Sequence, residues 1–249
     1  MKIGFLGVGT IASCVIEGFC GLGDEHEFFL SPRNKEKSAA LAAKYKNVQV
    51  CESNQQAVSE SDTVFISMLA HNCIDVLKEL KFKPTQQIIN VVATIPPEDI
   101  LRAIGEVGGF SHCIPLPSVK CRQGPIAVYP ESTFIKDLLS PLGTVVFGKT
   151  MDEVRTMQAI TALMSSFYEM LSHLSGFAEK EGLHPADSAA FMTAFFASLC
   201  YDKADADFHE LAMEMTPGGL NELALTTLTN SGAIKAWADV MEPVMKRIK

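Results

Sequence analysis

The chain opens with a short apolar run that leads directly into two glycines, and this opening constrains the fold more than any other feature. Residues 3–6 are Ile-Gly-Phe-Leu, and the residues that follow are Gly7, Val8, Gly9, Thr10, Ile11 and Ala12. A strand that turns sharply into a helix needs Gly7 in the turn, Gly9 where backbone approaches a pyrophosphate, and Ala12 where helix packs on strand. The N–H groups of the helix start attract phosphate. We therefore predict a dinucleotide site here, with a purely structural turn in another α/β domain as the alternative.

Composition places the chain among globular proteins. Of its 249 residues, 47% are hydrophobic and 20% are charged, which excludes intrinsic disorder. No apolar run approaches the ~20 residues of a membrane span, and the net charge of −8 argues against a general nucleic-acid surface. Seven scattered cysteines without a Cys-x-x-Cys pair favour reduced thiols over a structural zinc site. We expect a cytoplasmic protein with no export signal, no metal, no nucleic-acid partner and no membrane partner.

Hydrophobic patterning divides the chain into two domains of different class. The first 150 residues alternate short β-rich runs with helical runs, as in βαβ units on a parallel sheet. Strands are expected at residues 3–6, 27–30, 48–51, 63–69, 87–93, 111–114, 126–129 and 144–147. Besides the helix that follows Gly9, helices are expected at residues 35–45, 54–59, 73–80 and 97–104. We predict an α/β fold, a Rossmann-type doubly wound parallel sheet over residues 1–150 followed by an all-helical domain over residues 151–249.

Apolar residues in the C-terminal domain recur at helical spacing. A helix expected across residues 153–174 is apolar on more than one face, and residues 186–200 repeat this pattern with three phenylalanines. A helix buried on several sides needs more partners than a domain of ~100 residues offers, so we predict a homodimer through these helices. A central core helix in a monomer is the alternative. The last helix should be amphipathic and kinked at Pro243.

Candidate binding residues follow the ends of the predicted strands. In an open parallel sheet, ligands bind outside the carboxyl ends of the strands. For the cofactor, this rule selects Ser31, Arg33, Asn34 and Lys35 after the second strand, Leu69, Ala70 and Asn72 at the fourth, and Ala93 and Thr94 at the fifth. For catalysis and substrate it selects His71, and after the sixth strand Pro115 and Ser118. We expect a small-molecule substrate to meet the cofactor at this edge.

The end of the second strand discriminates between two cofactors. An NAD site usually places an acid there for the ribose 2′-hydroxyl, whereas an NADP site needs donors and positive charge for the 2′-phosphate. No acid precedes Glu36, while Arg33 and Lys35 supply two cations. We predict NADP(H). The alternative is an ordinary solvated helix start, although two cations there would oppose the helix dipole unless an anion compensates.

Other polar residues allow two interpretations each. His71 could hydrogen-bond a substrate or carry a proton, or it could be a polar residue at a strand end. Lys120 and Arg122 could bind a carboxylate, although solvation at the surface is the simpler interpretation. His112 and Cys113 lie inside a predicted strand and are expected to be packing residues.

A glycine-rich turn interrupts the helical half. Its residues are Thr216, Pro217, Gly218, Gly219, Leu220 and Asn221. Backbone N–H groups at a turn that opens a helix can bind an anion, which makes this turn a candidate for a substrate carboxylate. A plain connector between helices is the alternative.

Together these residues resemble the pyrroline-5-carboxylate reductase family over nearly the whole chain. The first matching segment is the opening, residues 1–9, and the second is the Ser-Pro-Arg-Asn run at 31–34, which is similar to that family's NADP loop. The third is Thr-Pro-Gly-Gly at 216–219, which is similar to the family's Ser-Pro-Gly-Gly-Thr-Thr signature. The resemblance implies a Rossmann domain, a helical dimerisation domain and NADPH-dependent reduction of a cyclic imine in proline biosynthesis. It also implies that Gly218 and Gly219 help to bind the substrate carboxylate.

Departures from the family concentrate where the substrate would bind. Leu116 replaces the Asn of the family's Met-Pro-Asn-Thr-Pro loop, residues 164–168 replace its Gly-Ser-Gly-Pro-Ala-Tyr segment, Asn221 replaces a Thr, and His71 with Asn72 replaces Lys-Pro. A site built to hydrogen-bond a polar group discriminates against partners that lack it, so we expect an altered substrate pocket. The residues expected at the reaction are His71, Ser118, Thr216 and Asn221. An NADP oxidoreductase with a deazaflavin partner and a dinucleotide-binding regulator without catalysis are the alternatives.

Overall fold

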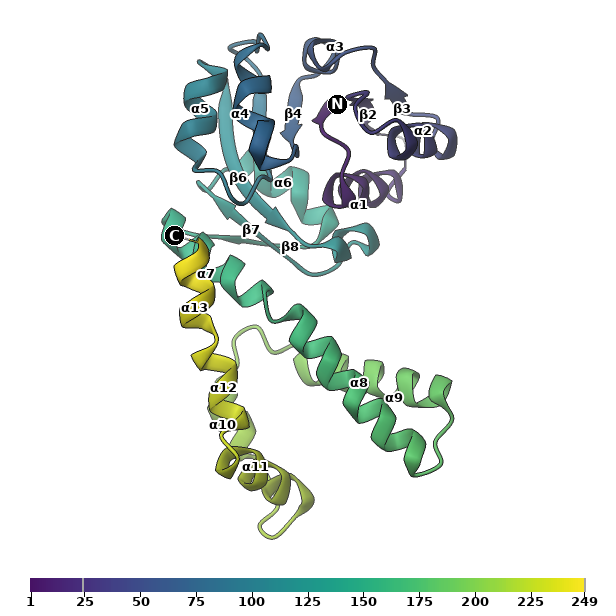
Figure 1. Ribbon diagram of the computed structural model, residues 1–249, viewed down its shortest axis with the longest axis vertical. Coiled ribbons are helices and arrows are strands. Elements are labelled where there is room, and N and C mark those ends of the chain that lie inside the picture. Colours follow the sequence, from purple (N-terminus) through teal and green to yellow (C-terminus); the bar gives the residue numbers. More distant parts are fainter. Residues whose placement is uncertain (24, 249) are drawn as a thin grey trace. The chain divides into compact units, whose positions relative to one another are not determined.

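The computed structural model describes residues 1–23 and 25–248. The chain divides into two compact units, Met1–Gln158 and Ala159–Lys249, and each is described by itself (Figure 1). The division falls inside the helix α7 (Met151–Thr161), after the boundary at residue 150 that the sequence pattern predicts. Val154 explains this, because it is 1% exposed and packs with Ile114 and Ala127 of the sheet.

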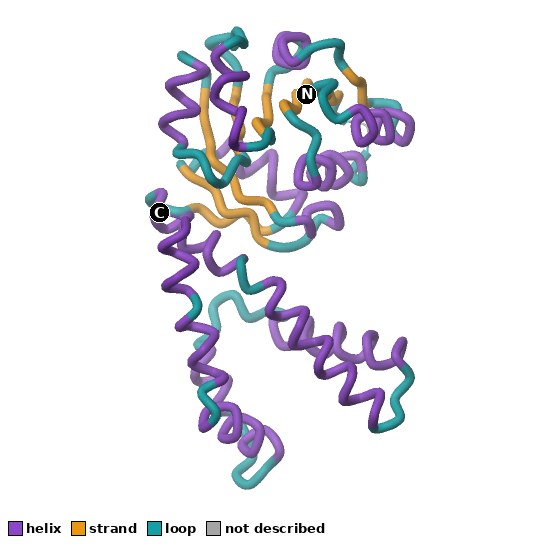
Figure 2. Tube along the Cα trace, viewed as in Figure 1, coloured by secondary structure: helices purple, strands orange, loops and turns teal. Residues whose placement is uncertain are grey.

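The N-terminal unit is built on one mixed sheet. Its strands are β1 (Lys2–Leu6), β2 (Glu27–Leu30), β3 (Val48–Val50), β4 (Thr63–Ile66), β5 (Gln87–Asn90), β6 (Gly109–Pro115), β7 (Pro125–Tyr129) and β8 (Thr144–Phe147). They lie in the order β3-β2-β1-β4-β5-β6-β7-β8, and each neighbouring pair is parallel except β6 with β7, which is antiparallel. Figure 2 shows strands in this unit and only helices and loops in the C-terminal one. The predicted Rossmann-type fold followed by a helical region is confirmed.

Helices connect the strands and continue through the second unit. In the N-terminal unit they are α1 (Thr10–Cys20), α2 (Lys35–Lys44), α3 (Asn54–Ser59), α4 (Ala70–Lys78), α5 (Pro97–Ile104) and α6 (Thr133–Leu139), with 3₁₀ helices η1 (Pro117–Cys121) and η2 (Ser140–Leu142). After α7 follow α8 (Met164–Lys180), α9 (Pro185–Cys200), α10 (Phe208–Met213), α11 (Leu220–Asn230), α12 (Ala233–Asp239) and α13 (Met241–Ile248).

Alternating side chains of the strands supply a separate core on each face of the sheet. Phe5 points to the face that α1, α2 and α6 cover, where it stacks on Phe65 with ring centroids 4.7 Å apart. Leu6, the next residue, points to the opposite face beneath α3, α4 and α5. Both residues are fully buried, as expected for strands covered on both faces.

Several predicted elements end at other residues. β4 stops at Ile66, not at 69, because the hydroxyl of Ser67 donates to the carbonyls of Leu6 and Gly7 at 3.2 and 2.6 Å and the chain leaves the sheet there. β5 likewise stops at Asn90, whose side chain accepts from the N–H of Val92. The expected start of a helix at residue 73 is wrong, because α4 starts at Ala70 and residues 70–72 form its first turn.

The long helix expected at 153–174 is two helices, because the chain leaves the α-helix after Thr161 and α8 starts at Met164. The last helix is also divided, at Val240, and Pro243 stands in the first turn of α13, where its missing N–H costs nothing. Pro243 therefore follows a break and does not kink a continuous helix. No helix in the described part of the chain is long and apolar enough to span a membrane.

A triad of charged groups ties α1 to its neighbours. Glu17 pairs with Lys44 of α2 at 2.7 Å and with Lys120 of η1 at 2.9 Å, and its side chain is only 15% exposed. The hydrogen bond from Lys44, together with that from Lys120, lowers the pKa of Glu17 below its ordinary value. A depressed carboxyl pKa adds stability above about pH 4.5, and this stability is lost as the pH falls through the folded-state pKa.

We therefore expect Glu17→Gln to lower the free energy of unfolding by about 1 kcal/mol at neutral pH, with the difference shrinking as the pH falls below about 4.5. Urea unfolding at several pH values measures it. Asp75→Asn is the matched control, because Asp75 pairs with Lys78 only at 3.9 Å with both side chains exposed, and it should change stability by less than about 0.3 kcal/mol. Equal effects of the two substitutions would contradict the role given to Glu17.

Candidate functional site

The turn after β1 can be made only by glycine at residue 7. Gly7 has φ of +91°, and a Cβ there would lie 2.7 Å from the carbonyl oxygen of Ser67. Its N–H donates to the hydroxyl oxygen of Ser31 at 2.8 Å, while its carbonyl accepts from Ser67. The turn is thus clamped between the ends of β2 and β4.

Gly9 opens α1 and leaves room beside the helix start. A Cβ on Gly9 would meet nothing within 4 Å, and its φ of −89° suits any residue. Within the described residues, no side chain caps α1 and no acid lies in its first turn. The first-turn N–H groups, which include those of Thr10, Ile11 and Ala12, are therefore suited to an anion.

The segment after β2 combines residues that hold the turn with residues that face solvent. Asn34 donates from Nδ2 to the carbonyl of Val8 at 3.0 Å, and its Oδ1 accepts from the N–H of Lys37 at the start of α2. Ser31 is 1% exposed and holds Gly7. Arg33 and Lys35 are exposed, and no ion pair is recorded for either among the described residues. The two cations are thus available to a ligand.

A cavity of about 520 Å³ lies where β1, β2 and β4 end. Its lining comprises Gly7, Val8, Gly9, Ser31, Arg33, Asn34, Lys35, Glu36, Asn54, Ser67, Met68, Leu69 and Val76. Seven of the predicted cofactor residues therefore meet at one place. Six lining residues were not among the predicted cofactor contacts: Val8, Glu36, Asn54, Ser67, Met68 and Val76. The polar Ser67 inside an apolar run was the signal that could have found one of them.

The remaining predicted cofactor residues lie outside that lining. Thr10 is exposed at the start of α1, where its hydroxyl accepts from Nζ of Lys37 at 3.3 Å. Among the described residues, the buried Oδ1 of Asn72 has no hydrogen-bond partner, so it is an acceptor that a bound hydroxyl or amide could satisfy. Ala70 is the first residue of α4, and Ala93 with Thr94 lies in the connection that follows β5. Their contact with a cofactor stays a prediction.

These features fit NADP(H). The helix start beside Gly9, without a side-chain cap among the described residues, suits a pyrophosphate, and the two exposed cations suit a 2′-phosphate. Glu36 also lines the cavity and would be adjacent to such a phosphate, so the cations must outweigh its charge.

The loop after β6 is bound to α1 by its basic residues. Lys120 pairs with Glu17, and Arg122 donates from Nη1 to the carbonyl of Gly21 at 2.9 Å. These contacts favour a structural role over carboxylate binding for both cations. Ser118 stands in η1 and is exposed, Pro115 ends β6 and is buried, and His71 is exposed in the first turn of α4. None of these three lines the cavity described above.

In the glycine-rich turn of the C-terminal unit, the backbone N–H groups of both glycines are already hydrogen-bonded within that unit. The N–H of Gly218 donates to Oε2 of Glu222 at 2.5 Å, and the N–H of Gly219 donates to the carbonyl of Thr216 at 2.9 Å. Gly218 has φ of +71°, and Thr216 and Asn221 are exposed. Carboxylate binding at this turn stays a prediction, and it would require the Glu222 carboxylate to leave Gly218.

Comparison with known proteins identifies relatives for both units. Residues 2–99 match a family model described as NADP oxidoreductase, coenzyme F420-dependent. A pyrroline-5-carboxylate reductase of Pseudomonas aeruginosa is 25% identical over 248 residues, covering 93% of this chain and 89% of that protein. The chain is therefore similar to a pyrroline-5-carboxylate reductase over nearly its whole length. These relatives indicate an NAD(P)-dependent oxidoreductase with NADP(H) as its cofactor.

Solved structures of pyrroline-5-carboxylate reductases share the fold. The enzyme of Streptococcus pyogenes has a TM-score of 0.83 at 22% identity, covering 100% of this chain and 98% of that one. The Plasmodium falciparum enzyme, solved with NADP bound, has a TM-score of 0.82 at 17% identity, covering 100% and 97%. The fold of the reductases therefore extends over both units of this chain.

Proposed function

We propose that the protein is an NADPH-dependent reductase that transfers hydride to a C=N bond, with a C=O bond as the alternative, of a small carboxylated substrate. The observation that carries this proposal is the cavity at the end of β1, where the start of α1 meets the exposed cations Arg33 and Lys35. Similarity to pyrroline-5-carboxylate reductases over 93% of the chain supports the class of reaction.

The protein's part in such a reaction is to bind and orient. The amides around Gly9 would hold the pyrophosphate, and Arg33 and Lys35 the 2′-phosphate. When bound, NADPH supplies the hydride. An imine that arrives protonated needs no strong protein acid, so exposed groups such as His71 and Ser118 would only orient or polarise it.

Residues of the C-terminal unit would hold the substrate carboxylate. Thr216 and Asn221 offer side-chain donors, and Gly218 and Gly219 offer amides once Glu222 has moved away. Leu116, where the family has Asn, supports a preference for a substrate other than the family's own. The organisation into an NADP-binding domain of residues 1–150 and a substrate and dimerisation domain of residues 151–249 is part of this proposal.

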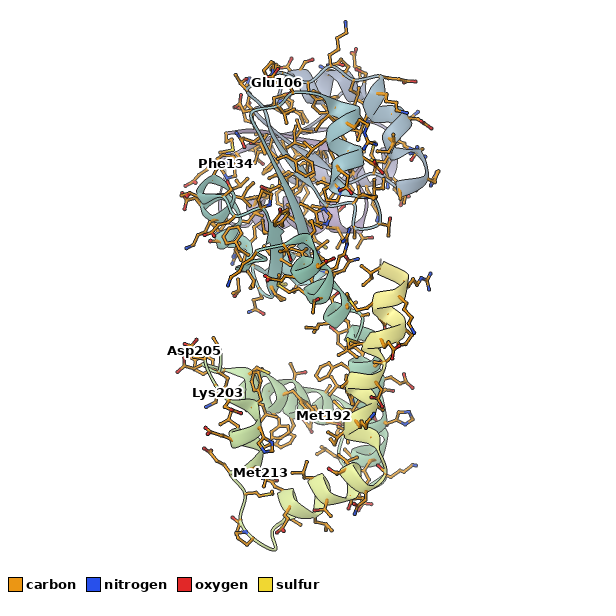
Figure 3. All side chains as sticks on the ribbon, turned by 90° about the vertical axis from the view of Figure 1, so that its left-hand side faces the viewer. Glu106, Phe134, Met192, Lys203, Asp205 and Met213 are labelled. Atoms are coloured by element: carbon orange, nitrogen blue, oxygen red, sulfur yellow. The ribbon has the colours of Figure 1, made fainter. Side chains whose placement is uncertain are left out.

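We further propose a homodimer through the C-terminal helices. Within the described residues α8 has no buried side chain, and Phe177 and Phe191 are 63% and 68% exposed. Met213, labelled in Figure 3, is also more than half exposed. Apolar faces of this extent are typical of an interface. Light scattering should give twice the mass of one chain, and a monomer would contradict the proposal.

Removing the guanidinium of Arg33 should shift the choice between NADPH and NADH. A charge-assisted contact to phosphate contributes about 1.5–3 kcal/mol, so we expect Arg33→Ala to raise the Kd for NADPH by roughly 10-fold to 100-fold. The Kd for NADH should change less than about twofold, because it lacks the 2′-phosphate. Fluorescence titration measures both. Arg102→Ala, which removes a helix-surface Arg paired with Asp99, is the matched control, and an equal loss for both cofactors in Arg33→Ala would contradict the assignment.

The function itself is tested by following NADPH oxidation with a panel of cyclic imines, imino acids and 2-oxo acids. We expect turnover of at least one carboxylated cyclic imine and faster turnover with NADPH than with NADH. No turnover of any of them would contradict the proposal.

One observation favours a second candidate, because the family model that matches residues 2–99 is that of coenzyme F420-dependent NADP oxidoreductases. Spectral change of a deazaflavin in place of imine reduction would support it. A third candidate is a dinucleotide-binding regulator without catalysis, because Leu116 stands where the family has Asn. Tight NADPH binding with no turnover of imines or deazaflavin would support it.

A further inference from the structure

A buried histidine in the sheet contacts the end of a strand that leads into the proposed site. His112 on β6 is paired with Asn90 in the parallel register of β5 and β6. His112 is 2% exposed and Asn90 is fully buried. Nδ1 of His112 and Nδ2 of Asn90 are 2.8 Å apart. The hydrogen bond thus joins two buried side chains at the carboxyl end of β5.

The protonation state of His112 follows from the hydrogen bonds of Asn90. The N–H of Val92 donates to Oδ1 of Asn90 at 3.0 Å, so the amide oxygen faces that loop. The Nδ2 group, which can only donate, therefore faces His112. His112 must accept this bond at Nδ1, which assigns the imidazole proton to Nε2.

Asn90 transmits this constraint to the loop after β5. Its Nδ2 lies 3.5 Å from the carbonyl oxygen of Val92, so both backbone polar groups of Val92 contact one side chain. Val92 is buried and directly precedes Ala93 and Thr94, the predicted cofactor contacts. The orientation of a single amide thus fixes the backbone at this end of β5.

The surroundings keep His112 neutral. Burial lowers the pKa of His112 to about 4, and the positive charge of Arg155 on α7 acts in the same direction. On its other side, Tyr129 of β7 is the paired residue in the antiparallel ladder. If Nδ1 were protonated, two N–H donors, Nδ1 of His112 and Nδ2 of Asn90, would face each other. The amide of Asn90 would then have to turn and release the N–H of Val92.

We propose that His112 is a positioning residue that acts through Asn90 to hold the loop of residues 92–94 in the shape that receives the cofactor. The proposal rests on the proposed function, because it takes Ala93 and Thr94 as cofactor contacts. It requires an acceptor at the position of Nδ1 and no proton on it.

Two substitutions of His112 separate this role from simple packing. Asn places a carbonyl oxygen near the position of Nδ1, whereas Leu fills similar space without an acceptor. Hydrogen exchange at the Val92 amide and the Kd for NADP⁺ are measured on the full chain. We expect His112→Leu to raise both the exchange rate and the Kd by roughly tenfold, the effect of losing about one buried hydrogen bond. His112→Asn should keep both within about twofold of the unaltered protein.

Acidification of the unaltered protein provides a second measurement if His112→Leu does not fold. Exchange at Val92, corrected for its intrinsic rate, should accelerate as the pH falls toward about 4, while in His112→Asn it should not. Equal exchange at Val92 in the Leu and Asn variants would overturn the proposal, and so would acceleration spread evenly over β5 and β6. Failure of the unaltered protein to bind NADP⁺ would instead contradict the proposed function, and the exchange at Val92 would still decide whether His112 holds the loop.

Discussion

Replacing Gly9 with Ala should abolish most cofactor binding and leave the fold intact. The added methyl group meets no protein atom within 4 Å, and the backbone conformation of residue 9 suits any amino acid. The same methyl group would occupy the space that the pyrophosphate needs beside the α1 amides. We expect the Kd for NADP⁺ to rise about 100-fold, equivalent to about 2.7 kcal/mol.

Calorimetric titration with NADP⁺ and a thermal melt test this expectation together. The melting temperature should change by only a few degrees, because Ala reduces the entropy of the unfolded chain but is a poorer N-cap than Gly, and the two effects are opposed. Both NADP⁺ and NAD⁺ should lose affinity, since both carry the pyrophosphate. Unchanged affinity in a folded Gly9→Ala variant would show that the pyrophosphate binds elsewhere.

Replacing Gly7 with Ala should destabilise the protein itself. Residue 7 has φ of +91°, and the new Cβ would lie 2.7 Å from the carbonyl oxygen and 2.9 Å from the carbonyl carbon of Ser67. The strained backbone at residue 7 and the displacement of Ser67 at the end of β4 each cost stability. We therefore expect the free energy of unfolding to fall by roughly 3 kcal/mol or more. Urea unfolding, followed by hydrogen exchange of amides in the N-terminal unit, measures this loss of stability.

Gly105→Ala separates the two causes. Gly105 also has positive φ, +77°, but a Cβ there meets nothing within 4 Å. Gly105 has ψ of −151°, a backbone conformation that side chains rarely adopt, so this variant should show only the cost of that conformation, about 1–3 kcal/mol. If Gly7→Ala costs no more than Gly105→Ala, the close approach of Ser67 does not restrict residue 7.

The strands and the cofactor turn were predictable because each depends on a local pattern. Continuous apolar runs mark strands buried on both faces, and Gly7 with Gly9 marks a turn whose geometry few other residues allow. The basic end of β2 was predictable from the charges of Arg33 and Lys35 alone. The two serines that clamp the turn were harder, because Ser31 and Ser67 act through contacts between strands distant in the sequence.

The direction of β7 and the start of α6 could have been predicted from connection length and from an N-cap residue, which hydrophobic periodicity does not take into account. The connection of residues 116–124 is shorter than the dozen residues of a parallel crossover, so β7 had to run antiparallel to β6. The helix α6 begins after Ser132, whose hydroxyl accepts from the N–H of Ile135 as an N-cap. The partners of Gly218 and Gly219 depend on Glu222, whose reach back to the turn no residue pattern indicated.

The most direct measurement of the proposed reaction follows the hydride itself. The protein is incubated with 1-pyrroline-5-carboxylate and related carboxylated imines together with NADPH deuterated at the transferable position, and the products are analysed by mass spectrometry. The proposed function predicts a reduced amine with one deuterium on the former imine carbon, formed by the unaltered protein and much more slowly by Gly9→Ala. Undeuterated or absent product with a protein that binds NADP⁺ would contradict it.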